Sequence, residues 1–167
     1  MLSLKDSILA AILASILVIS KEILAFLPNI ELVSFLLIIY TLTLGLKISA
    51  FSALLFAFLQ MLLYGIGLWT PMYFIVWPLL AGMTQLLRKY LTTEFRLALF
   101  SGAFGLVFGF LFSLPYFIVD SQAGIAYFLK GIPFDLIHGI GNYLVMLVLY
   151  QPVIRIFKNL TDRYRHQ

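Results

Sequence analysis

Residues 95–119, FRLALFSGAFGLVFGFLFSLPYFIV, decide the class of this protein, because they form an apolar run long enough to cross a lipid bilayer. A transmembrane helix needs about 20 mostly apolar residues, and this run carries one charged side chain, Arg96, near its start. The rest of the chain is similar: 63% of the residues are hydrophobic, 11% are charged, and the mean hydropathy is +1.07. Soluble domains carry about 25% charged residues, so the sequence predicts an integral membrane protein.

Further apolar runs lie on both sides of this one. We expect an all-helical bundle of six transmembrane helices at residues 7–27, 31–45, 48–64, 71–87, 95–119 and 133–157, in one membrane domain covering residues 1–167. Pro71 and Pro133 suit the first turn of a helix. The run at 31–45 is short for a full crossing and could instead be a re-entrant or buried segment. Residues 120–131 form the longest expected connection, where two glycines should break any helix.

The basic residues predict an orientation for this bundle. With six spans, nine of the 11 Lys and Arg residues fall at the end that holds both termini, and only Lys21 and Lys130 fall at the other. Short cytoplasmic loops are enriched in Lys and Arg, so we expect both termini in the cytoplasm. Because the bases act as topology signals, the net charge of +4 does not indicate nucleic-acid binding.

Polar residues collect in the outer half of the predicted bundle. They are Lys21, Glu22, Asn29, Glu31, Asp135, His138 and Asn142. A charge at mid-bilayer costs about 2.5–3.5 kcal/mol on insertion scales, so such groups usually face the bundle interior, a partner or water. Adjacent residues point in different directions, and we therefore expect Lys21 to meet Glu31 or Asp135 rather than its neighbour. Placement among lipid headgroups, or a hydrogen bond between His138 and Asn142, would explain these residues without a ligand.

Aromatic residues gather at the same outer end. They include Tyr64, Trp69, Tyr73, Trp77, Tyr116, Phe117, Tyr127 and Phe128. An interfacial belt explains Trp and Tyr at either end of a span, but the inner end has fewer rings, and Tyr73 and Trp77 share one helix face. The rings and the polar groups together predict a small-molecule pocket that opens to the outside. Its expected lining is Asn29, Glu31, Tyr73, Trp77, Asp135, His138 and Asn142.

Small residues recur at helical spacing in two of the runs. Ala10 and Ala14, like Ala11 and Ser15, would let another helix approach the first span closely. Gly102, Gly105 and Gly109 do the same in the fifth span. Packing within the chain and docking of a partner both explain such a pattern.

Over its whole length the chain resembles the substrate-binding S components of energy-coupling factor (ECF) vitamin transporters. The resemblance is carried by segments 21–33, 64–78 and 131–138 and by the Ala10-x-x-x-Ala14 motif. It implies a protein of the prokaryotic plasma membrane, a vitamin-like substrate taken from outside, and a gate formed by residues 27–31. It also implies that Ala10 and Ala14 dock onto a transmembrane T component. Two ATPase subunits would hydrolyse ATP, since this chain has no Walker-type loop. The chain itself is expected to be a transport subunit rather than an enzyme and to need no cofactor.

The resemblance leaves the ligand open. Metal-transporting relatives carry histidine at the second position, where this chain has Leu2, so no bound metal is expected. Sparse charge and many rings favour a ligand with an apolar or planar body, with cobalamin or a corrinoid precursor first and pantothenate next. Two other classes stay open. One is a structural membrane protein resembling the MreD cell-shape family; the other is an intramembrane enzyme using His138 with Asp135 or Glu31, without a recognisable nucleophile.

Overall fold

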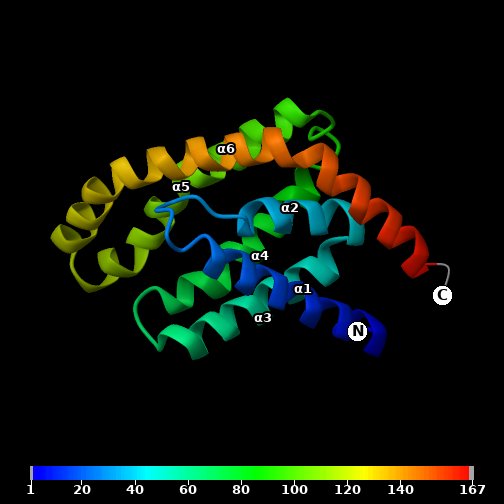
Figure 1. The fold of residues 1–167 in the computed structure, drawn as a ribbon. Coiled ribbons are helices and arrows are strands. Elements are labelled where there is room, and N and C mark those ends of the chain that lie inside the picture. Colours follow the sequence, from blue (N-terminus) through cyan, green and yellow to red (C-terminus); the bar gives the residue numbers. More distant parts are fainter. Residues whose placement is uncertain (1, 166–167) are drawn as a thin grey trace.

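The structure, a computed structural model, describes residues 2–165 except for the side chains of Arg163 and Arg165. Its elements are α1 (Leu4–Ile23), α2 (Val33–Leu44), α3 (Leu46–Tyr64), α4 (Thr70–Leu87), α5 (Glu94–Val119) and α6 (Ser121–Arg165). The first and last described residues lie at one end of the molecule with the α2–α3 and α4–α5 connections (Figure 1). We call this the terminal end, and the end with the other three connections the distal end. Consecutive helices therefore alternate in direction.

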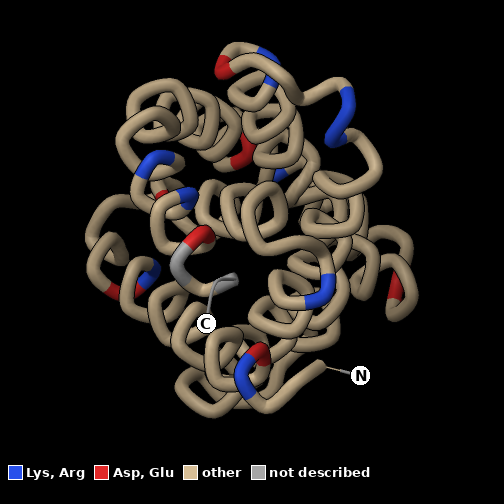
Figure 2. Tube along the Cα trace, turned by 90° about the vertical axis from the view of Figure 1, so that its right-hand side faces the viewer, with Lys and Arg blue, Asp and Glu red and all other residues tan. Residues whose placement is uncertain are grey.

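The two ends differ in charge as the sequence predicts. Figure 2 looks onto the terminal end, where several blue basic segments surround the two chain ends. Lys21 lies in the last turn of α1, and Lys130 lies near the start of α6, so both belong to the distal end. This distribution agrees with the expected grouping of the basic residues on one side of a membrane.

The outer surface of the molecule is apolar. Within residues 2–165, four helices, α3 to α6, are long and apolar enough to cross a membrane. Along α1, the side chains of Ile8, Ile12, Ile16 and Ile19 form an exposed stripe at helical spacing. Water-soluble monomers rarely expose a continuous apolar surface of this kind. The helical bundle and its surface therefore agree with the membrane protein that the composition predicts.

Helix α2 is the shortest element and lies in the core. Ten of its 12 residues are buried, and it packs against α3, α4 and α6. At a rise of 1.5 Å per residue, a helix of this length covers about 18 Å, well under the ~30 Å hydrocarbon core of a bilayer. The run at 31–45 was expected as one of six spans, with a re-entrant or buried segment as the alternatives; the structure forms a buried core helix there, too short for a full crossing.

Helix α6 is longer than the sequence predicts. Residues 120–131 were expected to form a connection, but the helix begins at Ser121, so Pro133 lies inside it rather than in its first turn. The 45 residues of α6 would extend about 68 Å if straight. Figure 1 instead shows it curving across the bundle from the distal to the terminal end.

Local contacts explain this early start of α6. The Asp120 carboxylate accepts hydrogen bonds from the backbone N–H groups of Gln122 and Ala123, at 3.3 and 3.0 Å. A side-chain oxygen in this position satisfies donors that the first turn of a helix leaves free. Gly124 does not break the helix, and the ring of Phe117 packs into the space where a Cβ would lie. The glycine is therefore used for close packing of α5 on α6.

Small residues pack helices together inside the chain. A Cβ added at Gly105 in α5 would lie 2.9 Å from the backbone of Gly139 in α6, so these two helices are in backbone contact. On α1, which packs mainly on α3, Ala10 and Ala14 are fully buried. In this conformation neither alanine is free to touch a partner. The exposed small residues of α1 are Ala11 and Ser15.

Candidate ligand-binding site

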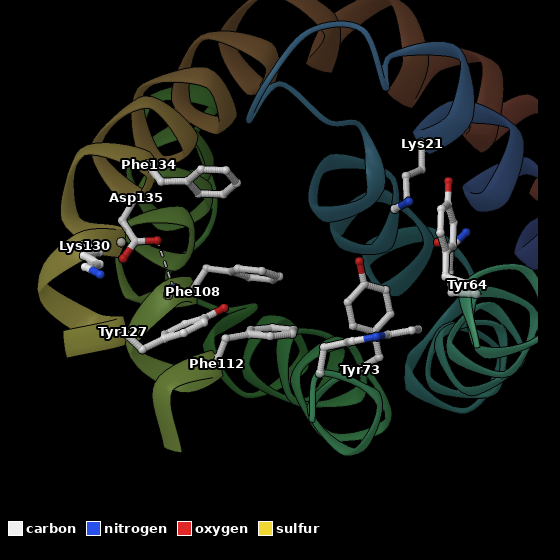
Figure 3. A pocket seen from close by; sticks show the side chains of 13 residues that line it. Lys21, Tyr64, Tyr73, Phe108, Phe112, Tyr127, Lys130, Phe134 and Asp135 are labelled. Atoms are coloured by element: carbon white, nitrogen blue, oxygen red, sulfur yellow. Dashed lines mark hydrogen bonds between the residues drawn. The ribbon is translucent and has the colours of Figure 1, made fainter. Parts of the chain in front are cut away.

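A cavity of about 600 Å³ lies at the distal end (Figure 3). We call it the ring cavity. It is lined by Lys21, Gln60, Tyr64, Trp69, Tyr73, Phe108, Gly109, Phe112, Tyr127, Lys130, Gly131, Phe134 and Asp135. Small-molecule pockets measure about 300–1,000 Å³ and are lined mostly by apolar and aromatic side chains with a few polar groups. The ring cavity has the size and the lining of such a pocket.

A second cavity of about 300 Å³ adjoins the first. The two share Lys21, Tyr73, Phe108 and Phe134. We call it the loop cavity, because residues 24–31, between α1 and α2, form much of its wall. The predicted gate, residues 27–31, lies within that wall. The two cavities together make one site with two compartments.

Aromatic rings build most of the ring cavity. Figure 3 shows Phe134, Phe108, Phe112 and Tyr127 on one side of it, and Lys21, Tyr64 and Tyr73 on the other. Phe108 and Phe112 are four residues apart on α5, and their rings stack with centroids 4.5 Å apart. Tyr73 meets Phe112 edge to face at 5.7 Å, which connects the two sides. The rings therefore hold one another in place without a ligand.

Tyr73 and Trp77 share one face of α4, as their spacing predicts. Their ring centroids are 5.7 Å apart in an edge-to-face contact. Trp77 is 3% exposed and also packs against Phe108 at 5.4 Å. Both residues line the loop cavity, and Tyr73 also lines the ring cavity. This face of α4 therefore belongs to both compartments.

Lys21 does not make the contact that the sequence predicts. Its Nζ lies 3.3 Å from Oε1 of the adjacent Glu22 and 4.4 Å from the centroid of the Tyr64 ring. Glu22 also accepts hydrogen bonds from Tyr64 Oη at 2.5 Å and from Gln60 Nε2 at 3.3 Å. The expected pairing with Glu31 or Asp135 is wrong, because the long Lys21 side chain bends back toward a carboxylate that α3 holds in place.

Asp135 is anchored by the backbone of α5. Its Oδ1 accepts a hydrogen bond from the N–H of Gly109 at 2.9 Å, and the residue is 4% exposed. Among the described residues it forms no ion pair with Lys21 or Lys130, although both lysines line the same cavity. Asp135 thus places a carboxylate in the wall of the ring cavity at a position fixed by the α5–α6 contact.

Glu31 connects the α1–α2 loop to two helices. Its carboxylate accepts hydrogen bonds from the backbone N–H of Ser34, the shorter at 2.9 Å, and so caps the start of α2. Its Oε1 also lies 3.4 Å from Nε2 of His138 in α6. The loop passes close to α6 one turn away, where a Cβ at Gly141 would lie 3.2 Å from the carbonyl oxygen of Asn29. The Glu31–His138 contact and this close approach hold the loop across α6.

The structure brings most of the expected pocket residues together. Tyr73 and Asp135 line the ring cavity, and Asn29, Glu31, Tyr73, Trp77 and His138 line the loop cavity. Asn142 lines neither cavity and is 1% exposed, one turn along α6 from His138. In the described part of the chain, no three His, Asp or Glu side chains are placed to hold a metal ion.

The sequence did not reveal the rings of α5 and α6 as site residues. Phe108, Phe112 and Phe134 lie in apolar runs, where a phenylalanine that faces a cavity looks the same as one that faces lipid. One signal was present: Phe104, Phe108 and Phe112 recur every four residues, with Gly109 beside them. That spacing predicts a ring-lined face, but not which element lies opposite.

Comparison of the chain with models of known protein families, with curated proteins and with solved structures finds no match. The functional interpretation therefore rests on the geometry of the two cavities and on the charge distribution of the chain.

Proposed function

We propose that this protein is the substrate-binding S component of an ECF-type importer, which captures a vitamin or related micronutrient outside the cell. The observation that carries this proposal is the ring cavity of about 600 Å³ at the distal end, away from both termini. If the base-rich terminal end faces the cytoplasm, as the positive-inside rule favours, the cavity opens to the outside. A structural protein of the cell-wall machinery would have no need for such a cavity.

The lining of the site supports a ligand with a planar or apolar body. Rings supply most of the contact area, and only a few polar groups are available to fix orientation. Cobalamin or a corrinoid precursor is the first candidate and pantothenate the second. In this proposal the chain only binds, while a T component and two ATPase subunits release the substrate into the cell.

Docking of the T component would use the exposed face of α1. Because Ala10 and Ala14 are fully buried, we propose that the neighbouring small residues Ala11 and Ser15 provide the close approach. They lie beside the exposed isoleucine stripe of the same helix. A helix of the T component could therefore pack along α1 without disturbing the core.

Native mass spectrometry of the gently purified full chain tests the proposal, combined with thermal shifts in the presence of cyanocobalamin, cobinamide and pantothenate. We expect a co-purified vitamin, or a raised Tm with at least one of these compounds. Gly131→Phe should abolish binding, because Gly131 lines the ring cavity and the nearest atom to its Cβ position, Asp135 Oδ2, is 4.0 Å away, so the new ring would enter the cavity. Gly82→Phe is the matched control, since Gly82 lies outside both cavities and has no neighbour within 4 Å of its Cβ position.

The absence of any bound compound together with an unchanged Tm for every vitamin would contradict this function and would favour the structural role resembling that of MreD proteins. A Gly131→Phe protein that binds as well as the wild type would instead show that the ligand lies outside the ring cavity.

A further inference from the structure

Buried polar atoms that lack a hydrogen-bond partner within the described chain gather around the loop cavity. Trp77 Nε1, His138 Nδ1 and Asn29 Oδ1 belong to residues that line it, and both amide atoms of Asn142 lie one helical turn beyond His138. Trp77, His138 and Asn142 are only 3%, 3% and 1% exposed. Roughly 90% or more of buried polar groups in proteins have a hydrogen-bond partner, so several unpaired atoms in one place indicate that a partner from outside the chain binds there.

The chemistry of these atoms is defined by their neighbours. The Glu31 carboxylate is an acceptor, so in the neutral form of the His138 ring the proton belongs on Nε2, which leaves Nδ1 as an acceptor. Trp77 Nε1 can only donate, and the Asn142 amide offers both a donor and an acceptor. Two residues in the wall of the loop cavity, Trp77 and His138, thus carry an unpaired donor and an unpaired acceptor, and Asn142 carries one of each a helical turn behind His138.

These unpaired groups carry no net charge. The ammonium of Lys21, which reaches both cavities, is already paired with Glu22 at 3.3 Å, and Glu31 is occupied by Ser34 and His138. A free carboxylate or phosphate would find no unpaired cation in the lining of the loop cavity. A neutral planar group with a donor and an acceptor on the same edge would satisfy the unpaired atoms. Primary and secondary amides and amide-like nitrogen heterocycles have this character.

We propose that the loop cavity is the recognition subsite for a neutral amide or amide-like nitrogen heterocycle of the ligand, whose apolar body lies in the ring cavity. This inference rests on the proposed substrate-binding function and narrows its substrate class. Trp77 and His138 contact the group directly. Asn142 lies one helical turn behind His138 and supports the polar end of the site from there. Corrinoids carry primary amides on their rim and pantothenate has an internal amide, so both candidate ligands contain the required group.

The first test measures the stability of the ligand-free full chain in detergent. Trp77→Phe and Asn142→Leu keep most of each side chain's volume and remove its hydrogen-bonding group. Ser101→Ala is the control, because Ser101 Oγ is also buried and unpartnered but lines neither cavity. Removing an unpartnered buried polar group is neutral or stabilising, so Tm should stay equal or rise in Asn142→Leu and Ser101→Ala. Trp77→Phe also leaves a void among the rings around it, which lowers Tm whatever the state of Nε1, so this variant is used only in the binding test. A lower Tm in Asn142→Leu but not in Ser101→Ala would show that the Asn142 amide is paired within the apo protein, and would overturn the proposal.

The second test compares matched ligands. Cobinamide is paired with the heptamethyl ester of cobyrinic acid, which has methyl esters in place of the amides. Pantothenate is paired with pantothenol, which keeps the amide and loses the carboxylate. Wild type should bind the amide-bearing corrinoid at least about tenfold more tightly than the ester, or bind pantothenol within a few fold of pantothenate. Trp77→Phe and Asn142→Leu should each weaken binding of the amide-bearing compound that wild type binds by about tenfold, while Ser101→Ala leaves its affinity unchanged.

The outcomes separate this inference from the function on which it rests. If wild type binds one of these compounds but the ester binds as well as the amide, or the two variants keep full affinity, the subsite is wrong and the transport function stands. If pantothenol loses binding that pantothenate retains, the recognised group is the carboxylate and the subsite is also wrong. If wild type binds none of them, the proposed function fails and the subsite fails with it.

Discussion

Gly109 is the residue on which the position of Asp135 depends. Its N–H donates to Asp135 Oδ1 at 2.9 Å, and a Cβ at this position would overlap the Asp135 carboxylate. We expect Gly109→Ala to displace Asp135, to destabilise the protein by about 1–3 kcal/mol and to weaken ligand binding. Gly82→Ala is the control, because its Cβ would meet nothing within 4 Å and alanine favours helix. Equal Tm values for the two variants would contradict the anchoring of Asp135 by α5.

Lys21 and Asp135 act independently in this structure, and a double-mutant cycle can measure that. Lys21 is paired with Glu22 at 3.3 Å, whereas Asp135 is held by the α5 backbone. The effects of Lys21→Met and Asp135→Asn on the free energy of unfolding should therefore add within about 0.5 kcal/mol. Lys21→Met and Glu22→Gln should not add, because those side chains are in contact. A coupling of more than about 1 kcal/mol between Lys21 and Asp135 would show that they meet in solution.

Single contacts were the hardest part of the site to predict from the sequence. The direction of Cβ atoms correctly placed Asp135, His138 and Asn142 on one face of α6, and all three are buried. The same reasoning failed for Lys21, because a long flexible side chain can turn back to its neighbour. What decides that contact is the position of Tyr64 and Gln60 on α3, which no local pattern contains.

At the scale of elements, α1 presents two faces that should respond differently to the same substitution. Ala14 is fully buried, so Ala14→Leu should overpack the α1–α3 contact and cost about 1–3 kcal/mol of stability. Ser15 is exposed and its Oγ bonds only to the Ala11 carbonyl oxygen, so Ser15→Leu should leave Tm almost unchanged. If Ala11 and Ser15 dock a T component, Ser15→Leu should block uptake in cells while the isolated protein still binds ligand. Normal uptake by Ser15→Leu would exclude this face as the docking site.

A contact between the first turn of α1 and the last turn of α6 should give stability a pH dependence. Tyr164 Oη donates to Asp6 Oδ1 at 2.6 Å, and Lys5 Nζ donates to the Tyr164 carbonyl oxygen at 2.8 Å. The hydrogen bonds from Tyr164 and then Ser3 hold the pKa of Asp6 below its ordinary value. Burial, and next the hydrogen bond to Asp6, raise the pKa of Tyr164 to about 12. Both residues lie at the terminal end, outside the apolar part of their helices.

The sign of each contribution follows from these shifts. The contribution of Asp6 is present above its ordinary pKa of about 3.9 and is lost as the pH falls through its lowered value. The contribution of Tyr164 is present below its ordinary pKa of about 10 and is lost as the pH rises through about 12. The difference in Tm between wild type and Tyr164→Phe should be constant from about pH 5 to 9 and shrink outside that range. A difference that varies within the range would mean that other groups control this contact.

The extent of most helices was predictable, and the exception has a local cause. Helices α3, α4 and α5 start at Leu46, Thr70 and Glu94 and end where the apolar runs end, because Gly and Pro positions and loss of hydropathy mark those ends. Helix α6 was cut short in the prediction because Gly124, Gly131 and Pro133 normally signal a break. The capping carboxylate of Asp120 and the packing of Phe117 on Gly124 outweigh that signal.

At the scale of the whole molecule, composition predicted the helical membrane bundle, but not its arrangement. Helix α2 is the buried core helix because it packs against α3, α4 and α6. Helices α4 and α6 are distant from it in the sequence, so a local pattern does not predict these contacts. Gly105 and Gly139 bring α5 and α6 together, and the α1–α2 loop lies across α6 at Gly141, so the walls of the two cavities come from segments that are remote in the sequence. Such contacts between remote segments determine the site and leave little trace in hydropathy.

The orientation of the bundle determines whether the site can receive a ligand from outside. The chain has no native cysteine, so single cysteines can be introduced at exposed positions at each end and labelled specifically. Gln122 lies at the distal end and Lys89 at the terminal end, and both are exposed. If the terminal end is cytoplasmic, an impermeant thiol reagent should label Gln122→Cys on intact cells and should label Lys89→Cys only after permeabilisation.

Each other labelling pattern has a definite meaning. The reverse pattern would turn both cavities toward the cytoplasm, where they could not capture an external nutrient. Labelling of both positions on intact cells would place the two ends on the same side of the membrane, which is incompatible with α5, the helix between them, as a crossing helix. Only the first pattern leaves the ring cavity open to the outside, where an external nutrient could enter it.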